Sequence, residues 1–94
     1  MVEWDESKRL ANLAKHGIDF DDAVHIFQGL VLETTDDRRN YGERRVKALG
    51  MTQGQILCVV YTVRGERRRI ISARRANRNE RENYRSTQVA QRPD

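Results

Sequence analysis

Residues 61–84 have the sequence YTVRGERRRIISARRANRNERENY, and this segment organises the rest of the chain. It predicts the end of one strand, a tight turn at Arg64-Gly65-Glu66, a second strand over 67–73 and then a helix. Asn77 is placed to cap that helix, and Glu80, three residues later, completes a capping box. The segment therefore predicts a hairpin that runs into a C-terminal helix.

The second predicted strand carries an unusual distribution of charge. Strict alternation of side chains gives each of its faces an apolar residue beside an arginine. An ordinary half-buried strand carries charge on one face only, so cations are expected near the edge of the core. One face is expected to hold Arg69, Ile71 and Ala73, and the other Ile70, Ser72 and Arg74.

Composition points to a small, basic domain. The chain has 94 residues, 37% hydrophobic and 34% charged, with a net charge of +4. Residues 1–63 hold 8 Lys and Arg against 10 Asp and Glu, whereas residues 64–94 hold 10 Arg against 4 acids. Arginine forks suit phosphate oxygens and stack on bases, which makes nucleic acid the first partner to consider. The alternative is a solvated arginine face that makes weak surface pairs.

The first part of the chain predicts a short strand over 2–4 and two helices. Asp5 is a good N-cap for the first helix, over 6–16, and the second helix is expected over 19–28. Each helix has an apolar stripe that we expect to face the core. The first stripe consists of Leu10, Leu13 and Ala14, and the second of Phe20, Ala23, Val24 and Phe27.

After residue 29 the hydrophobic period becomes that of strands. Strands are expected over 30–34, 44–51, 55–63 and 67–73, with turn chemistry in 35–43 and at Gln53-Gly54. The predicted fold is α+β, with two N-terminal helices packed on an antiparallel sheet of about four strands and a C-terminal helix. We expect residues 1–94 to form a single domain whose tail, 86–94, is flexible.

Several kinds of site have no support in the sequence. Cys58 is the only cysteine and lies in an apolar run, which fits a reducing compartment. No apolar run approaches membrane-spanning length, so we expect a cytoplasmic protein with no membrane partner. His16 and His25 lack partners at metal-ligand spacing, and no P-loop or GxGxxG motif is present. We therefore expect no metal and no cofactor.

Arginines, lysines and carboxylates suffice to cleave RNA without a metal. The ribose 2′-hydroxyl is an internal nucleophile, so an enzyme has to remove its proton, hold the phosphate and neutralise the developing charge. Arg64, Arg74 and Arg75 are the cations expected at the phosphate. Four further arginines are expected to bind the rest of the RNA: Arg67, Arg68, Arg69 and Arg78.

Two sources of proton transfer remain open. Glu80 in the C-terminal helix is one, and the pair Lys15 and His16 is the other. Each has a structural alternative, because Glu80 also fits the capping box, and cations at the end of a helix complement its dipole. Arg67 and Arg68 have the strongest alternative, since a hairpin tip is normally solvated.

Three separated motifs resemble the BrnT family of bacterial toxins. They are EWDE at 3–6, NLxKHGIxF at 12–20 and RIISARRA at 69–76. The resemblance implies a RelE-like ribonuclease fold and the role of toxin in a type II toxin–antitoxin pair, in which RNA cleavage inhibits translation and growth. Carried over by motif, the implied site residues are Lys15, His16, Arg64, Arg74, Arg75 and Glu80.

The resemblance also implies a protein partner. A BrnA-like antitoxin with a ribbon-helix-helix DNA-binding domain would form a hetero-oligomer with the toxin, such as a 2:2 complex, and repress their shared promoter. Operator DNA would then be bound only through the antitoxin, and RNA would be the substrate. The competing hypothesis is a non-catalytic basic module that binds RNA, DNA or an acidic partner by charge alone.

Overall fold

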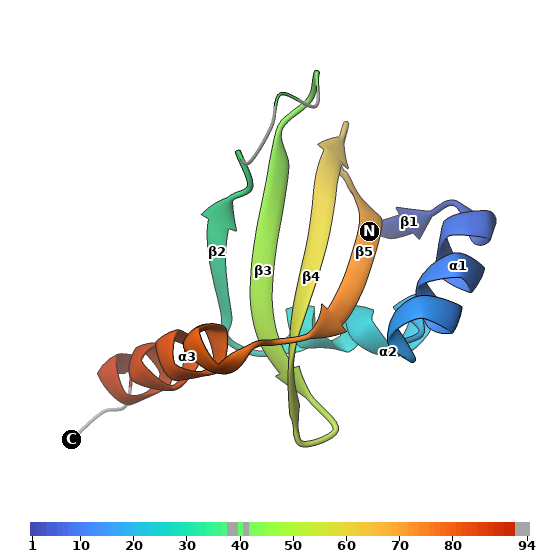
Figure 1. The fold of residues 1–94 in the computed structure, drawn as a ribbon. Helices are drawn as coiled ribbons and strands as arrows, with labels where there is room; N and C mark the ends of the chain where they lie inside the picture. The colour runs from blue at the N-terminus through green and yellow to red at the C-terminus, as the bar shows by residue number, and fades with distance from the viewer. Residues whose placement is uncertain (38–39, 41, 92–94) are drawn as a thin grey trace.

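The computed structural model describes residues 1–37, 40 and 42–91, so the predicted turn region 35–43 and tail 86–94 lie partly outside the described residues. Figure 1 shows α1 and α3 on opposite sides of a twisted sheet. The elements in chain order are β1 (Val2–Trp4), α1 (Glu6–His16), α2 (Phe20–Ala23), the 3₁₀ segment η1 (Val24–Gln28), β2 (Val31–Thr35), β3 (Arg45–Thr52), β4 (Gln55–Arg64), β5 (Arg67–Arg75) and α3 (Arg78–Gln91).

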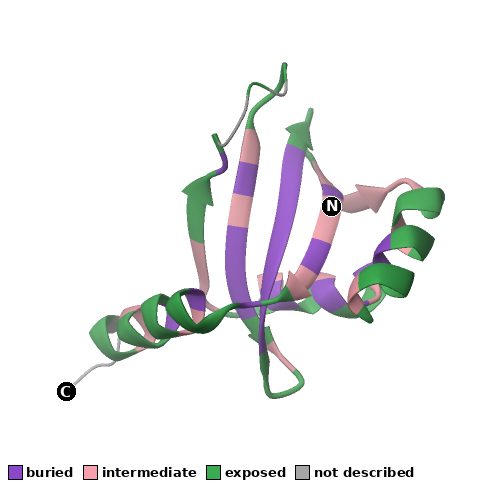
Figure 2. Cartoon of the chain, viewed as in Figure 1, coloured by how far each residue is buried: buried purple, intermediate pink, exposed green. Residues whose placement is uncertain are grey.

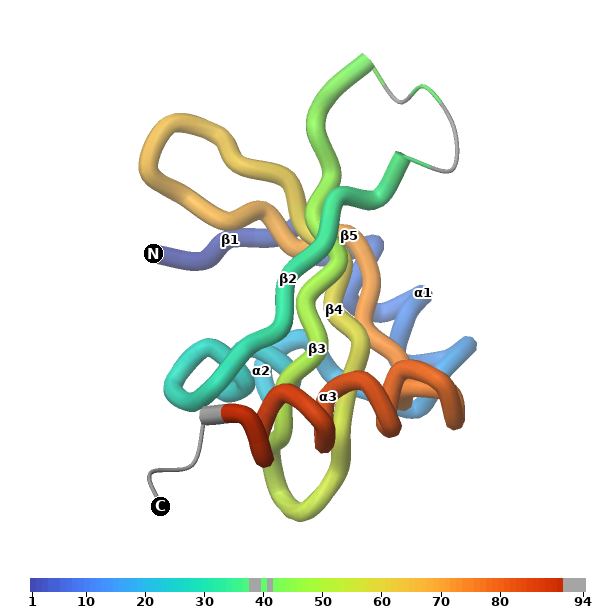
Figure 3. Tube along the Cα trace, turned by 90° about the vertical axis from the view of Figure 1, so that its left-hand side faces the viewer, coloured from blue at the N-terminus to red at the C-terminus, as the bar shows by residue number. Residues whose placement is uncertain are grey.

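The sheet has five strands in the order β1-β5-β4-β3-β2. This confirms the predicted α+β class, but the prediction of four antiparallel strands is wrong. The short strand β1 joins the sheet and runs parallel to β5, with Val2 opposite Arg68 and Trp4 opposite Ile70. Sequence pattern indicates that a segment is extended, but it does not indicate which distant segment it pairs with. In Figure 3 the β4–β5 hairpin and the far ends of β2 and β3 diverge, as strand twist requires.

The predicted alternation of side chains along β5 is wrong, because this strand contains a β-bulge. The register between β4 and β5 shifts between Val60 and Tyr61, because Ile71 is skipped in the pairing. The extra residue turns the side chains that follow it. Ile70 and Ala73 consequently lie in the same hydrophobic cluster, although strict alternation had placed them on opposite faces.

The two faces of the sheet are covered to different extents. We call the face packed against α2 and η1 the helical face; its core includes the fully buried side chains of Phe20, Ile26 and Val59. We call the other face, toward which Leu49 and Cys58 point, the open face. There α3 forms a smaller cluster with the sheet. Figure 2 shows that burial is concentrated in the central strands.

Helix α1 has the predicted bounds but buries a different side. The Asp5 side chain accepts hydrogen bonds from the first turn, and Gly17 ends the helix in the left-handed conformation with φ 71°. The predicted apolar stripe is wrong, however, because Leu10 is 53% and Leu13 38% exposed. The buried residue of this helix is Asn12.

Asn12 attaches α1 to the sheet through hydrogen bonds. Its Nδ2 donates to the carbonyl oxygens of Ile18, at 2.9 Å, and Ala73, at 2.8 Å, while its Oδ1 accepts from the Ala73 amide at 3.0 Å. The two bonds to Ala73 satisfy backbone groups of β5 that lie beyond its pairing with β1. A polar residue therefore performs the docking that the apolar stripe was expected to perform.

The second predicted helix is shorter and tighter than expected. It consists of the four-residue α2 followed by the 3₁₀ segment η1. Phe20 and Ala23 are buried as predicted, and the 3₁₀ period then buries Ile26, three residues after Ala23. A Cβ at Gly50 of β3 would lie 2.6 Å from the Cβ of Ile26, so glycine is what allows η1 to approach the sheet this closely.

Candidate active site

A buried carboxylate and two cations meet on the open face. Arg74 of β5 donates from Nη1 to Oε1 of Glu80 at 2.7 Å and from Nη2 to Oε2 at 2.9 Å, which is a bidentate pair. Lys47 of β3 donates from Nζ to Oε2 of the same carboxylate at 2.9 Å. The Glu80 side chain is only 7% exposed, whereas those of Lys47 and Arg74 are about one third exposed. The cluster therefore presents two cations to solvent over a buried anion.

Local sequence positions Glu80. The Asn77 Oδ1 accepts from the Glu80 amide at 2.9 Å, and the Asn77 amide donates to Glu80 Oε1 at 2.8 Å. This reciprocal arrangement confirms the predicted capping box. The Tyr84 hydroxyl, one turn further along α3, donates to the Leu30 carbonyl at 2.8 Å and holds the helix against the start of β2.

Strand register positions the two cations. Arg74 is opposite Cys58, and Leu49 of β3 is opposite the same cysteine. Leu49 and Cys58 pack together on the open face. Lys47, two residues before Leu49, points to the same side. The two strands thus place Lys47 and Arg74 on either side of β4, above the start of α3.

The cluster keeps Glu80 ionised. Hydrogen bonds from Arg74 are the main reason that the pKa of Glu80 falls to about 2; burial opposes them, and hydrogen bonds from the Asn77 amide and Lys47 lower the pKa further. One anion and two cations leave the cluster with a net positive charge. Such a group can bind and orient an anion such as a phosphate. A carboxylate with this pKa is a weak base at neutral pH until its cationic partners move.

A small cleft lies beside the cluster. It has a volume of about 130 Å³, and Lys47 and Arg74 form part of its wall. The remaining wall comes from the end of β2 and the loop after it: Thr34, Thr35, Asp36 and Asp37. Both cations of the cluster therefore line the cleft, together with two aspartates of the loop after β2.

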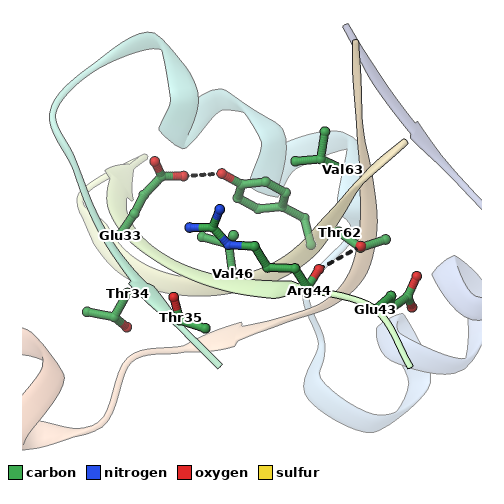
Figure 4. A pocket seen from close by; sticks show the side chains of 9 residues that line it. Glu33, Thr34, Thr35, Glu43, Arg44, Val46, Thr62 and Val63 are labelled. Carbon is green, nitrogen blue, oxygen red and sulfur yellow. Dashed lines mark hydrogen bonds between the residues drawn. The ribbon is translucent and has the colours of Figure 1, made fainter. Parts of the chain in front are cut away.

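A larger hollow, of about 450 Å³, is formed by β2, β3 and β4 near the β2–β3 loop. Figure 4 shows Glu33, Arg44 and Thr62 among the side chains around it. The Tyr61 hydroxyl donates to Glu33, and burial, with this contact, raises the pKa of Tyr61. Thr62 Oγ1 donates to the Arg44 carbonyl at 2.7 Å. Because Glu33 is already engaged by a neutral hydroxyl, we place the candidate chemistry at the smaller cleft, where two cations converge.

The structure separates the neighbours Arg74 and Arg75. Arg75 is opposite Leu57, whose side chain belongs to the helical-face core. The Nε of Arg75 donates to Gln55 at 3.0 Å, and the Nη1 of Arg75 donates to the His16 carbonyl at 3.4 Å. Lys15 is exposed on α1, next to His16. The structure thus brings Arg74 and Glu80 together, whereas Arg75 lies on the helical face of the sheet, near the end of α1 that carries Lys15 and His16.

The remaining predicted arginines have separate environments. Arg64, at the end of β4, lies 3.7 Å from Glu43, whereas Arg67 and Arg69 of β5 both contact Glu3. The other two, Arg68 and Arg78, do not belong to the open face of the sheet. Arg68 lies on the helical face with its guanidinium carbon 4.3 Å from the centre of the Phe27 ring, and the exposed Arg78 pairs with Glu82 on α3.

Lys47 is the member of the cluster that sequence analysis did not single out. Its signal was the alternation Arg45-Val46-Lys47-Ala48-Leu49, in which charged and apolar residues take turns on β3. This pattern puts Lys47 on a half-exposed face, but only the pairing of β3, β4 and β5 brings it near Arg74. Within the described ranges, no three His, Cys, Asp or Glu side chains gather as metal ligands would.

Comparison with known families identifies the class of protein. Residues 4–80 match the model of the ribonuclease toxins, named BrnT, of type II toxin–antitoxin systems. The chain is therefore a toxin of the ribonuclease class whose family acts together with an antitoxin. Because the match covers most of the sequence, the chain belongs to the BrnT family. A search of curated proteins found no relative that matches. None of the helices in the described part is long and apolar enough to cross a membrane.

Proposed function

We propose that this toxin is a metal-independent endoribonuclease whose active site is the cluster of Lys47, Arg74 and Glu80. The observation that carries the proposal is the convergence of two half-exposed cations on one buried carboxylate, in a chain of a ribonuclease family. RNA supplies its own nucleophile, so holding the phosphate and moving protons suffices for cleavage. In this proposal the toxin acts in the cytoplasm, where it arrests translation and growth.

In the proposed mechanism the scissile phosphate binds to Arg74 and Lys47. As these cations turn toward the phosphate, their hold on Glu80 weakens and its pKa rises from about 2 toward the ordinary value. Glu80 then accepts the 2′-hydroxyl proton while the 2′-oxygen forms a bond to phosphorus. The bond from phosphorus to the 5′-oxygen breaks, and Lys47 gives that oxygen a proton. The products end in a 2′,3′-cyclic phosphate and a 5′-hydroxyl.

Lys15 and His16, with Arg75 beside them, are the competing assignment for proton transfer. Glu80→Gln preserves the shape of the capping residue but removes its capacity to take a proton. We expect Glu80→Gln to abolish cleavage and retain RNA binding, and His16→Gln to cleave like the parent chain. The reverse result would move proton transfer to the end of α1.

The central experiment is incubation of the purified chain with end-labelled RNA, with and without EDTA. Because Arg74→Ala leaves a buried carboxylate with one cation fewer, Arg74→Lys is tested beside it, and thermal melting reports whether each variant folds. We expect cleavage that survives EDTA, leaves 2′,3′-cyclic phosphate ends and is lost in Arg74→Ala. Cleavage that stops with EDTA and returns with Mg²⁺ would refute metal independence.

A purified chain that leaves RNA intact calls for a second measurement in cells. Induced expression of the parent chain is expected to arrest growth, and expression of Arg74→Ala is not. Growth arrest without cleavage in vitro would indicate a nuclease that needs the ribosome. The absence of both would favour the non-catalytic basic module, for which the excess of arginine in residues 64–94 is the supporting observation.

We also propose that the antitoxin is BrnA-like, with a ribbon-helix-helix domain that carries the complex to operator DNA. An antitoxin segment with acidic and apolar residues would complement the cations of the open face. Co-expression with the adjacent reading frame is expected to yield a hetero-oligomer, whose mass by light scattering tests a 2:2 composition. If the affinity of the toxin for the antitoxin changed neither with salt concentration nor on loss of Arg74, this binding mode would be contradicted.

A further inference from the structure

Carboxylates flanked by two cations recur on the open face. Besides Glu80, Glu3 of β1 accepts from Arg69 Nη1 at 2.6 Å and from Arg67 Nη1 at 3.2 Å. Hydrogen bonds from Arg69, then Arg67, lower the pKa of Glu3, so it is ionised at neutral pH. Each group has one anion against two cations and keeps a net positive charge.

Glu43, two residues before β3, forms a third and looser group of this kind. Its Oε1 lies 3.8 Å from Arg45 Nη2, and its Oε2 lies 3.7 Å from Arg64 Nη2. The three groups share a composition of one carboxylate and two cations. Together they contain six cations of the open face: Arg45, Lys47, Arg64, Arg67, Arg69 and Arg74.

Strand register places these groups on one side of the sheet. Arg45 is opposite Thr62, Thr62 is opposite Arg69, and Arg69 is opposite Glu3. This row crosses four neighbouring strands and lies two residues along β3 from Lys47. The bulge at Ile71 is what turns Arg69 to the same side as Arg74.

The groups extend along the strands for the length of a short oligonucleotide. Arg74 is opposite Cys58, and Arg67 is opposite Arg64, six residues further along β4. At about 3.4 Å per residue, this separation is roughly 20 Å. Side chains two residues apart on one face recur about every 7 Å. Such a ladder of cations suits the repeating phosphates of an extended strand.

We infer that the open face is a track for single-stranded RNA that runs from the Glu80 cluster to the β4–β5 hairpin, with phosphate subsites at Glu3 and at Glu43. In each subsite one carboxylate lies between two guanidinium groups, and a guanidinium carries five N–H donors, more than one carboxylate can occupy. These side chains are only partly buried, so the ion pairs are weak and the guanidinium groups can turn toward a phosphate while they stay near the carboxylate. The identity of the ligand as RNA rests on the proposed function, whereas the track rests on the register and contacts.

The track assigns different roles to arginines that the sequence groups together. Arg67 and Arg69 belong to it. Arg68 does not, because it stacks on Phe27 and Tyr61 of the helical face. Removal of Arg67 and Arg69 should therefore weaken the binding of long RNA without preventing the cleavage of short RNA.

The test measures affinity for 2′-O-methyl RNA, which lacks the nucleophile, at lengths of about 4 and about 12 nucleotides that bracket common single-strand site sizes. The chain is compared with Arg67→Ala/Arg69→Ala and with the matched control Lys8→Ala/Arg85→Ala. The control removes the same charge from exposed helix positions off the track. Arg64→Ala, at the exposed hairpin end, is a further track variant that leaves the core untouched.

We expect the parent chain to prefer the longer oligonucleotide. The Arg67/Arg69 variant should lose that preference and bind the longer oligonucleotide at least about tenfold more weakly at low salt. The slope of log affinity against log salt concentration should become shallower by about 1.4, because each lost phosphate contact removes about 0.7. Arg64→Ala should show half of this change in slope. The control should keep both the preference and the slope. Equal losses in control and track variants, or equal affinity of the parent chain for both lengths, would overturn the track.

The cleavage assay separates this inference from the proposed function. If the parent chain cleaves RNA and the Arg67/Arg69 variant keeps the full length preference, the track is wrong and the nuclease stands. If the chain neither cleaves RNA in vitro nor arrests growth in cells, but its length preference depends on Arg67 and Arg69, the nuclease is wrong and the track is the surface of a binding module.

Discussion

The two faces of the sheet are made from the same strands and serve different purposes. On the helical face, Phe20, Ile26 and Val59 are fully buried, and apolar burial holds α2 and η1 in place. On the open face, α3 covers only part of the sheet, and beyond it charged side chains stand in groups around carboxylates. Stability and proposed chemistry are therefore separated by the thickness of one sheet, and substitutions on the two sides should have different consequences.

The bulge at Ile71 produces this separation in β5. Without it, Ile70 would lie on the same side as Arg74 and compete with it for the open face. With it, Ile70 and Ala73 join the helical-face core, while Arg69 and Arg74 point away from that core. One extra residue sorts a strand of mixed composition into an apolar side and a cationic side.

The largest difference between the faces is expected for the neighbours Arg74 and Arg75. Arg74→Gln should lower the rate of RNA cleavage about 10²- to 10³-fold, as the loss of a charge-stabilising donor does. Arg75→Gln should lower it by less than about tenfold, because its partners are Gln55 and the His16 carbonyl. Single-turnover cleavage measures both. Equal losses would show that the chemistry is not confined to the open face.

Asn12 should be the residue of α1 on which stability depends most. Asn12→Ala leaves buried backbone groups of Ile18 and Ala73 without partners, at a cost of about 4 kcal/mol. Leu13→Ala, on the exposed side of α1, should cost less than about 1 kcal/mol. Urea denaturation of both variants tests this. A larger effect at Leu13 would mean that another surface covers that side of α1.

Acid should weaken the open-face cluster selectively. The pKa of Glu80 is about 2 in the folded chain, below the value of 4.5 for an ordinary glutamate. The cluster therefore contributes to stability above pH 4.5, and this contribution disappears as the pH falls toward 2. Its size is roughly 3 kcal/mol. Because other carboxylates also titrate, the quantity to measure is the difference in unfolding free energy between the parent chain and Glu80→Gln, which should shrink over this range. A constant difference would contradict the assigned pKa.

The smallest effect concerns Arg68, the arginine that packs on the helical face. Its guanidinium stacks on Phe27 and approaches Tyr61, so Arg68→Ala should cost about 1 kcal/mol of stability. The exposed Arg78 serves as the control, and Arg78→Ala should change stability by less than about 0.5 kcal/mol. Thermal melting distinguishes the two. If Arg68→Ala instead left stability unchanged, Arg68 would have to be reassigned to the surface.

Features that depend on nearby residues were predictable. The caps at Asp5, Gly17 and Asn77 and the strand 55–63 follow from residues a few positions apart, and the structure confirms them. Features that depend on distant segments were not. The pairing of β1 with β5 and the burial of Asn12 in place of Leu13 both require knowing what lies opposite.

The candidate site divides in the same way. The sequence by itself determined the family motifs, the excess of arginine after residue 63 and the capping box that orients Glu80. Only the tertiary structure decided that Lys47 joins Arg74 and that Arg75 does not, because this depends on the register of three strands and on one bulge. Capping is settled within one helical turn, whereas the meeting of side chains from separate strands is settled by which register buries the most apolar surface.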